Sequence, residues 1–212
     1  MAIISNGILG SFSGKVGSVV GGSWRGIQYI RSLPKKVKRV PTEKMLNQQA
    51  KFALAMSFVN PLRSFLKENY EDEKIRYMTS ANLLSSHILR HAVQGNLPEI
   101  KLNYSKIIIS KGTVEQLLDI SSEKLDRVIS VKWGAEEKYL VPLAEVEVRG
   151  VIYNENKNHF HHFKLGSRKT AQGEISLSLF DKGEKVAIWL YTMDKKTNRI
   201  SESQFINEFT VK

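Results

Sequence analysis

Hydrophobic positions recur with two different periods along the chain, and the period changes near residue 100. Before that point they are spaced by three and four residues, which predicts helices. The strongest helical pattern follows Pro41, with Thr42 as a candidate N-cap. Five residues recur down one face of this helix: Met45, Gln49, Phe52, Met56 and Val59. Pro61 should kink it or start a second short helix through Phe65, because proline removes a backbone donor.

A further helix is predicted from about Thr79 to Val93, after a polar loop over residues 68–74. Gly95 follows it as the expected C-cap, and Pro98 stands just beyond. A glycine and then a proline form the usual stop signal of a helix, because the first adopts a left-handed backbone and the second cannot continue the helix.

From Ile100 the pattern alternates, which predicts strands. The candidate strands cover residues 106–110, 127–133, 143–153, 160–165, 174–180, 186–191 and 205–211. Their spacing is typical of an antiparallel sandwich, and the placing of Trp133, Trp189 and Tyr191 is similar to fibronectin type III and immunoglobulin-like modules. The expected core positions are Val128, Ser130 or Val131, Trp133, Val146, Val148, Ile175, Leu177, Leu179, Ile188 and Leu190.

The first forty residues differ from the rest in being rich in glycine and in cations. Two short apolar runs flank Gly21 and Gly22, which predicts a hairpin that turns at these glycines. Residues 34–41 form a basic linker bounded by two prolines. Residues 1–40 hold seven basic side chains and no acidic one, which leaves only +4 of the net charge of +11 for the other 172 residues.

Concentrated positive charge favours a polyanionic partner, which could be nucleic acid, an anionic membrane surface or an acidic protein face. The alternative is a solvated basic tail. The candidate polyanion-binding residues are Lys15, Arg25, Arg31, Lys35, Lys36, Lys38 and Arg39. Trp24 and Tyr29 are candidates for stacking on bases or for packing at an interface. The alternative for these two is that, with Ile27, they are core residues of a hairpin docked on the helices.

Catalytic and metal chemistry find little support in the sequence. The chain has no cysteine, which excludes disulfides and thiolate chemistry. The segment GSFSGKV lacks the glycine and the hydroxyl residue that a phosphate-binding loop needs at Leu9 and Val16. His87 and His91 lie four apart on a predicted helix without the glutamate of a metalloprotease motif, and a surface or interface pair is the favoured interpretation.

The three histidines at positions 159, 161 and 162 lie in a predicted edge strand. Alternation places His159 and His161 on one face and His162 on the other, so they do not converge on a metal. No deep pocket holding titratable side chains is predicted, and we therefore expect no enzyme activity, no cofactor, no metal and no small-molecule substrate.

The N-terminus lacks the basic n-region of a signal peptide, and no apolar run has the length of a membrane span. We therefore expect a cytoplasmic protein, or one within an assembled particle, without a membrane span.

The sequence also resembles a family of uncharacterised Bacteroidota proteins that is defined by a domain of unknown function. The first part of the resemblance rests on Gly10, Ser13, Gly14, Lys15, Val16, Gly17, Val20, Trp24, Gly26, Arg31, Pro34, Gln48, Lys51, Phe52, Pro61 and Leu62. Further positions are Asn82, Gly95, Tyr104, Ser110, Lys111, Gly112, Trp133, Arg168, Ser201, Ser203 and Val211. The resemblance implies a glycine-rich arm, helices and a C-terminal β-sandwich, and it brings no established activity.

These patterns together predict an α+β protein with three parts. They are a basic, glycine-rich hairpin arm over residues 1–41, a helical segment over 42–98 and an antiparallel immunoglobulin-like or fibronectin-like sandwich over 99–212. The expected function is non-catalytic binding of nucleic acid or a ribonucleoprotein through the arm. The alternative is a structural subunit of a larger assembly, such as a phage particle or a secretion apparatus, in which the arm contacts neighbouring protein subunits.

Overall fold

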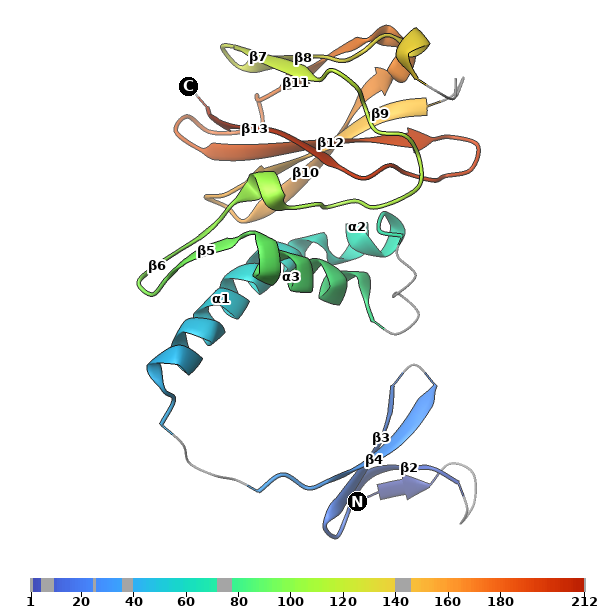
Figure 1. Cartoon of the computed structure of the whole chain (residues 1–212), viewed down its shortest axis with the longest axis vertical. Coiled ribbons are helices and arrows are strands. Elements are labelled where there is room, and N and C mark those ends of the chain that lie inside the picture. The colour runs from blue at the N-terminus through green and yellow to red at the C-terminus, as the bar shows by residue number, and fades with distance from the viewer. Residues whose placement is uncertain are drawn as a thin grey trace. The chain divides into compact units, whose positions relative to one another are not determined.

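A computed structural model of the chain describes residues 2–4, 10–24, 26–35, 40–71, 78–139 and 146–211. The protein has a mixed α+β fold with mostly antiparallel sheets and one long helix. It divides into two compact units, Met1–Thr42 and Glu43–Lys212, whose elements are labelled in Figure 1. In the described part, none of the helices is long and apolar enough to cross a membrane.

The first unit is a four-stranded antiparallel sheet in which consecutive strands are neighbours. Its strands are β1 (Ala2–Ile4), β2 (Phe12–Val16), β3 (Val19–Trp24) and β4 (Ile27–Ser32). The predicted turn at Gly21 and Gly22 is wrong, because both glycines lie in the middle of β3. The connections instead contain Gly17 and Gly26, whose φ angles of 55° and 82° suit glycine.

Close approach between strands explains why glycines occupy the middle of β3. A Cβ atom on Gly21 would collide with the backbone carbonyl oxygen of Phe12 on β2. A Cβ atom on Gly22 would lie 2.9 Å from the ring of Tyr29 on β4. A glycine in a strand often marks such an approach, and the sequence pattern alone did not distinguish it from a turn.

The second unit begins with the helices that the three-and-four spacing predicts. They are α1 (Glu43–Val59), the 3-10 turn η1 (Asn60–Leu62), α2 (Arg63–Glu68) and α3 (Ser80–His91). The helix restarts at Pro61 as predicted, and Thr79 caps α3 by accepting a hydrogen bond from the Asn82 backbone N–H. The Gly95 prediction is wrong, because α3 ends at the C-cap Ala92.

Gly95 belongs instead to a hairpin that is not among the predicted elements, formed by β5 (Val93–Asn96) and β6 (Glu99–Leu102). Its φ of 81° is needed there, since a Cβ atom would collide with the Glu99 carbonyl oxygen across the hairpin. The chain then passes through η3 (Tyr104–Lys106), so residues 106–110 are not the predicted strand. The Ser203 hydroxyl accepts from the backbone N–H groups of Ile109 and Ser110 at 2.8 and 3.2 Å, in place of a strand partner.

Two antiparallel sheets follow. The larger has the order β10-β9-β12-β13 and the smaller the order β11-β8-β7. The bounds are β7 (Ser121–Leu125), β8 (Val128–Lys132), β9 (Val146–Asn154), β10 (His159–Ser167), β11 (Gln172–Ser176), β12 (Lys185–Asp194) and β13 (Gln204–Thr210). The 3-10 turn η4 (Glu136–Lys138) lies between β8 and β9 along the chain, and η5 (Arg168–Thr170) lies between β10 and β11. Strand β7 is not among the predicted strands, because SSEKL is polar and only two of its five positions are partly buried.

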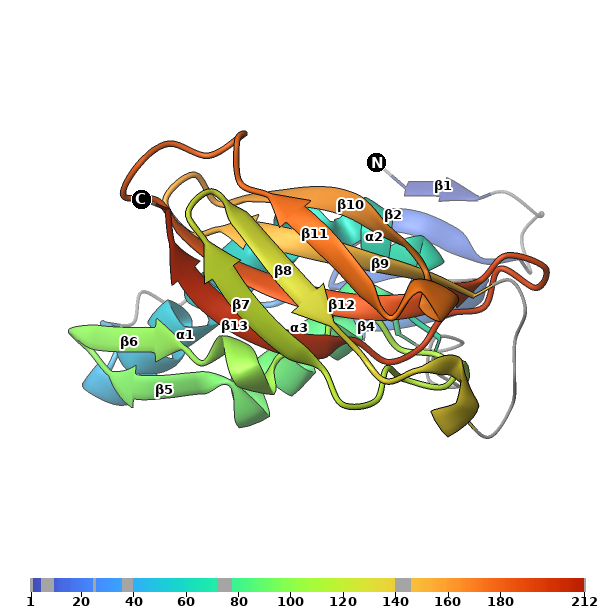
Figure 2. The ribbon, with the colours of Figure 1, turned by 90° about the horizontal axis from the view of Figure 1, so that it is seen from above.

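The larger sheet is the middle layer of the second unit, with the helices on one face and the smaller sheet on the other (Figure 1). Figure 2 shows the smaller sheet lying over the larger one. Alternate residues of β12 enter the two cores: Trp189 packs with Phe58 of α1, while Ile188 packs with the cluster that includes Ile129 of β8. Both faces of the larger sheet are therefore buried.

Most of the predicted sandwich core is buried, but Leu179 is 73% exposed. Strand β11 ends at Ser176 rather than continuing to residue 180. The Phe180 N–H donates to the Leu177 carbonyl, and this turn places Phe180 in the core and Leu179 in solvent. Val128 and Ser130 are half-buried, and Val131 is the fully buried member of that group.

Candidate functional site

The predicted polyanion-binding residues lie in the first unit or just after its last strand. Lys15 is on β2, Arg31 is on β4 and Lys35 follows β4, and all three are exposed. The other four predicted cations, Arg25, Lys36, Lys38 and Arg39, lie outside the described residues. Trp24 ends β3 and Tyr29 is in the middle of β4.

Strand register brings the described candidates on β2, β3 and β4 to one face of the sheet. Lys15 pairs with Val20, and Val20 pairs with Arg31, so these three side chains form one row across the strands. Gly22 is two residues after Val20 on β3, and it pairs with Tyr29. Side chains two positions apart share a face of a strand, so Tyr29 lies beside this cationic row.

Trp24 and Ile27 form the next row of the same face. We call the face that carries Lys15, Arg31, Tyr29, Trp24 and Ile27 the aromatic-basic face. Trp24, Ile27 and Tyr29 are 52, 64 and 45% exposed, so they are not core residues of the first unit. The Tyr29 ring lies over Gly22, which provides the space because it has no side chain.

The opposite face of the sheet is also apolar. It carries Val16, Val19 and Ile30, of which Val16 and Ile30 are 51 and 65% exposed. Phe12 lies on this face too, against Gly21. A small sheet needs a buried apolar face for independent stability, and in the described residues of the first unit neither face has a covering layer of its own.

The two histidines of α3 lie close together, and His87 contacts a backbone carbonyl. The His87 and His91 rings lie 4.9 Å apart, and the His87 Nε2 atom is 2.9 Å from the carbonyl oxygen of Lys106. In the part of the chain that the structure describes, no cluster of three or more ligand-type residues is placed to hold a metal ion.

The strand histidines separate as alternation predicts. The rings of His159 and His161 lie 4.8 Å apart, and His161 contacts Phe180 of the sandwich core. His162 points to the helical side, where its ring stacks on Phe65 of α2 at 4.9 Å. Strand β10 is at the edge of its sheet, so its histidines lie beside solvent.

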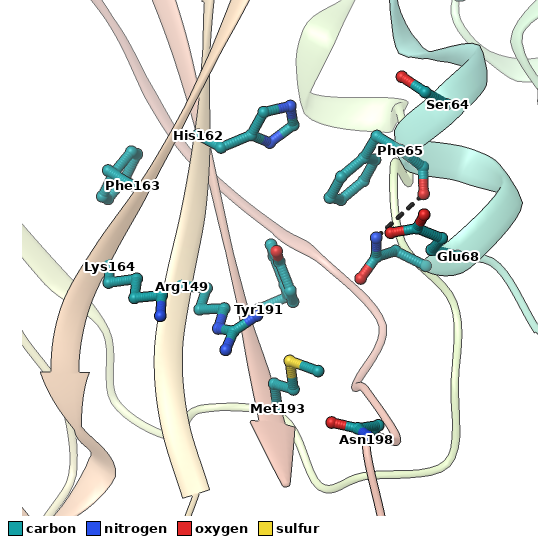
Figure 3. A pocket seen from close by; sticks show the side chains of 11 residues that line it. Ser64, Phe65, Glu68, Arg149, His162, Phe163, Lys164, Tyr191, Met193 and Asn198 are labelled. Carbon is teal, nitrogen blue, oxygen red and sulfur yellow. Dashed lines mark hydrogen bonds between the residues drawn. The ribbon is translucent and has the colours of Figure 1, made fainter. Parts of the chain in front are cut away.

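The structure has a pocket lined in part by titratable side chains, which the sequence does not reveal. A pocket of 590 Å³ lies between α2 and the larger sheet (Figure 3), and we call it the α2 pocket. Its lining residues are Ser64, Phe65, Glu68, Asn69, Arg149, His162, Phe163, Lys164, Tyr191, Met193 and Asn198. They come from separate segments of the chain, so no local motif marked the site, and only the alternation within β9, β10 and β12 could have grouped some of them.

Electrostatics in the α2 pocket centre on Arg149. Its Nε and Nη2 atoms donate to one carboxylate oxygen of Glu147 at 3.0 and 2.7 Å, and Lys195 pairs with the other oxygen at 3.0 Å. These hydrogen bonds from Arg149 and Lys195 hold the pKa of Glu147 below its usual value. Burial raises the pKa of Tyr191, and the nearby Arg149 partly offsets this effect.

Comparison with known proteins identifies the family. Residues 11–207 match the model of a family of unknown function, DUF6266. The chain belongs to this family. No curated protein matches the chain. The resemblance to a family defined by a domain of unknown function is thus confirmed, and membership of DUF6266 itself carries no activity or partner.

Proposed function

We propose that this DUF6266 protein is a non-catalytic protein that binds single-stranded nucleic acid on the aromatic-basic face of its first unit. The register of β2, β3 and β4 is the observation that carries the proposal, because it groups Lys15 and Arg31 with Tyr29 and Trp24. Cations neutralise phosphates and release counterions, and exposed aromatic rings stack on bases without sequence preference.

The geometry suits a flexible strand better than a duplex. Tyr29 and Arg31 are two positions apart on β4, which separates their Cα atoms by about 7 Å. One ring and one guanidinium can therefore contact a base and its own phosphate. Bases in a duplex are stacked on each other, so Tyr29 and Trp24 could reach their flat faces only in a single strand.

Fluorescence anisotropy of labelled oligo(dT) and oligo(U) tests the proposal with the full chain. We expect affinity to fall steeply with salt, and the double variant Lys15→Gln/Arg31→Gln to reduce the slope of log affinity against log salt by about 1.4. The control is Lys132→Gln, an exposed cation on β8 of the other unit.

Two substitutions on β4 test the contribution of base stacking to the affinity. Tyr29→Ala should weaken binding about tenfold, because loss of base stacking costs about 1–3 kcal/mol. Ile30→Ala, on the opposite face of β4 and 65% exposed, should leave affinity unchanged. Equal effects of the two variants, or no binding at low salt, would refute the proposal.

A second candidate function is a structural subunit of an assembly, and the two exposed apolar faces of the first unit favour it. A sheet with Val16 and Ile30 exposed on the face opposite Tyr29 gains stability when a protein surface covers that face. Light scattering should then show a defined oligomer that Ile30→Glu converts to a monomer. A monomer at every concentration would exclude self-assembly.

We further propose that the two sheets of the second unit form an immunoglobulin-like sandwich. If β7 to β13 are lettered A to G, the smaller sheet has the order E-B-A and the larger the order D-C-F-G. A constant-type immunoglobulin domain differs only in pairing D with E. Nuclear Overhauser contacts of β8 amides with β7 and β11, and of β9 amides with β12, would support this sandwich, whereas amide contacts between β8 and β12, which belong to different sheets, would contradict it.

A further inference from the structure

The α2 pocket contains an arrangement of charges that needs an explanation. Lys164 on β10 and Arg149 on β9 are directly paired in the register, and Arg149 is directly paired with Tyr191 on β12. The three side chains therefore form one row on the helix-facing side of the sheet, and all three line the pocket. Like charges directly opposite each other on adjacent strands are destabilising.

Glu147 relieves only part of this repulsion and also orients Arg149. It accepts from the Nε and Nη2 atoms of the guanidinium and shares its second oxygen with Lys195. The side chains of Arg149 and Glu147 are only 25 and 15% exposed, so this contact is partly shielded from water. A guanidinium held in this way loses little freedom when it binds an anion.

The pocket also has an apolar part, formed by Phe65 of α2 and by Tyr191 and Met193 of β12, while Ser64, Glu68 and Asn69 make the rest of the α2 wall polar. Figure 3 shows Phe65 facing the row of Lys164, Arg149 and Tyr191 from α2, with Glu68 one turn further along the helix. The rings of Phe65 and Tyr191 lie 5.8 Å apart at 68° to each other, and Met193 lines the adjoining surface. Phe65, Tyr191 and Met193 together suit a small apolar or aromatic body.

The charge balance favours a monoanion. Three cations, Arg149, Lys164 and Lys195, accompany two carboxylates, Glu147 and Glu68, in the lining and its direct ion pairs. One positive charge is left, which a single carboxylate neutralises and a doubly charged phosphate would exceed. The volume of 590 Å³ is in the range of small-molecule sites.

We propose that the α2 pocket binds a small monocarboxylate with an aromatic or branched apolar body. Arg149 and Lys164 hold the carboxylate, and Phe65, Tyr191 and Met193 pack on the body. This site is separate from the aromatic-basic face and does not depend on the proposed nucleic-acid binding.

Titration of the full chain by two-dimensional amide NMR tests the proposal with a matched pair of probes, 3-phenylpropanoate and its neutral analogue 3-phenylpropanamide. We expect the acid to shift amides of α2, β9 and β10 with a dissociation constant of about 1 mM or below. The amide should bind at least about tenfold more weakly, because it lacks the charge that Arg149 and Lys164 recognise.

Lys164→Gln gives the decisive variant, because Lys164 is exposed and substitutions at exposed positions generally change stability little. It should weaken binding of the acid about tenfold, since a hydrogen-bonded charge pair is lost. Lys169→Gln, an exposed cation on η5 outside the lining, should have no effect. Equal binding of acid and amide, unchanged affinity in Lys164→Gln, or no shifts in this region up to about 10 mM acid would overturn the proposal.

Discussion

Gly21 shows how one residue type carries two opposite meanings in a sequence. A pair of glycines between apolar runs is a turn signal, yet Gly21 is buried inside β3 because the Phe12 backbone and ring occupy the space of its missing side chain. At the neighbouring Gly22, the Tyr29 ring occupies the space where a side chain would lie. The glycines thus allow close strand contact rather than chain reversal, and the sheet that carries the aromatic-basic face depends on them.

Gly21→Ala should therefore disrupt the pairing of β2 with β3. The collision involves a backbone atom, so the strands must separate, and we expect a cost of about 1–3 kcal/mol in the local stability of the first unit. Native-state hydrogen exchange of the amides of β2 and β3 measures this directly. Ser23→Ala, an exposed position on the same strand, is the control, and equal protection in both variants would contradict the structure.

His161 and His162 occupy opposite faces of β10 and share one electrostatic property. Burial, followed by the neighbouring histidines, lowers the pKa of His162 below its ordinary value of 6.5. Burial, His159 and Lys157 lower the pKa of His161, and Glu184 opposes this shift. Between the lowered pKa and 6.5 the unfolded chain binds more protons than the folded one, so protonation favours unfolding.

The stability of the second unit should consequently fall as the pH drops below about 6.5, and it should be fully present above that value. Urea unfolding at neutral and mildly acidic pH measures this change. The double variant His161→Gln/His162→Gln should flatten the profile in this window. The carboxylate of Glu147, whose pKa is lowered from 4.5, acts only at lower pH, so a profile that stays equally steep in the variant would assign the effect to other groups.

At the scale of elements, α1 is a helix as predicted, but only the end of the predicted apolar face is buried, at Val59 and partly at Met56. Met45 and Phe52 are 48 and 51% exposed, whereas Ala55 and Phe58 are fully buried. Phe58 contacts the rings of Tyr104, Tyr153, Phe160 and Trp189. Spacing predicts that a helix has an apolar face, but only the partner layer decides which apolar residues it covers.

This difference gives a matched pair of substitutions on one helix. Phe58→Ala should reduce the unfolding free energy by about 3–5 kcal/mol, because it leaves a cavity among four aromatic rings. Phe52→Ala should change it by no more than about 0.5 kcal/mol. Chemical denaturation monitored by circular dichroism compares them, and a large effect at Phe52 would mean that its exposed face packs against another surface.

Strand prediction depended on how strongly each strand alternates. Strands β8, β9, β10, β12 and β13 alternate clearly or carry long apolar runs, and the sequence locates them well. Strand β7 is missed because it is polar. Residues 106–110 are misassigned because the Ser203 hydroxyl, from a distant part of the chain, accepts from the backbone N–H groups of Ile109 and Ser110. A side-chain hydrogen bond across more than ninety residues leaves no local signal.

At the scale of the whole molecule, the candidate sites differ in how far the sequence reveals them. The residues of the aromatic-basic face lie within one short stretch, so composition pointed to them, and the register then showed which share a face. The α2 pocket brings Phe65 of α2 together with Arg149, Lys164 and Tyr191 from three strands of the larger sheet. Its charged side chains become neighbours only because β10, β9 and β12 are adjacent in the sheet. The order of strands along the chain does not determine which strands are adjacent.

The same sheet order determines how the second unit should unfold. The larger sheet contributes residues to the helical core and to the core of the smaller sheet, and Trp189 and Ile188 are adjacent residues that enter different cores. Loss of either outer layer would expose one apolar face of β9 and β12 to water. We therefore expect residues 43–212 to unfold as one cooperative unit rather than as separate segments 42–98 and 99–212.

Leu84→Ala in α3 and Ile129→Ala in β8 test this expectation, because both side chains are fully buried but lie in different cores. Each should lower the same transition by about 2–5 kcal/mol, whether it is followed by helical circular dichroism or by tryptophan fluorescence. Trp189 lies in the core beneath the helices and Trp133 in the core between the two sheets, so tryptophan fluorescence reports on both cores. If Leu84→Ala shifted only the helical signal, the helices would be a separate domain, and α2 could not provide a stable wall for a pocket on the larger sheet.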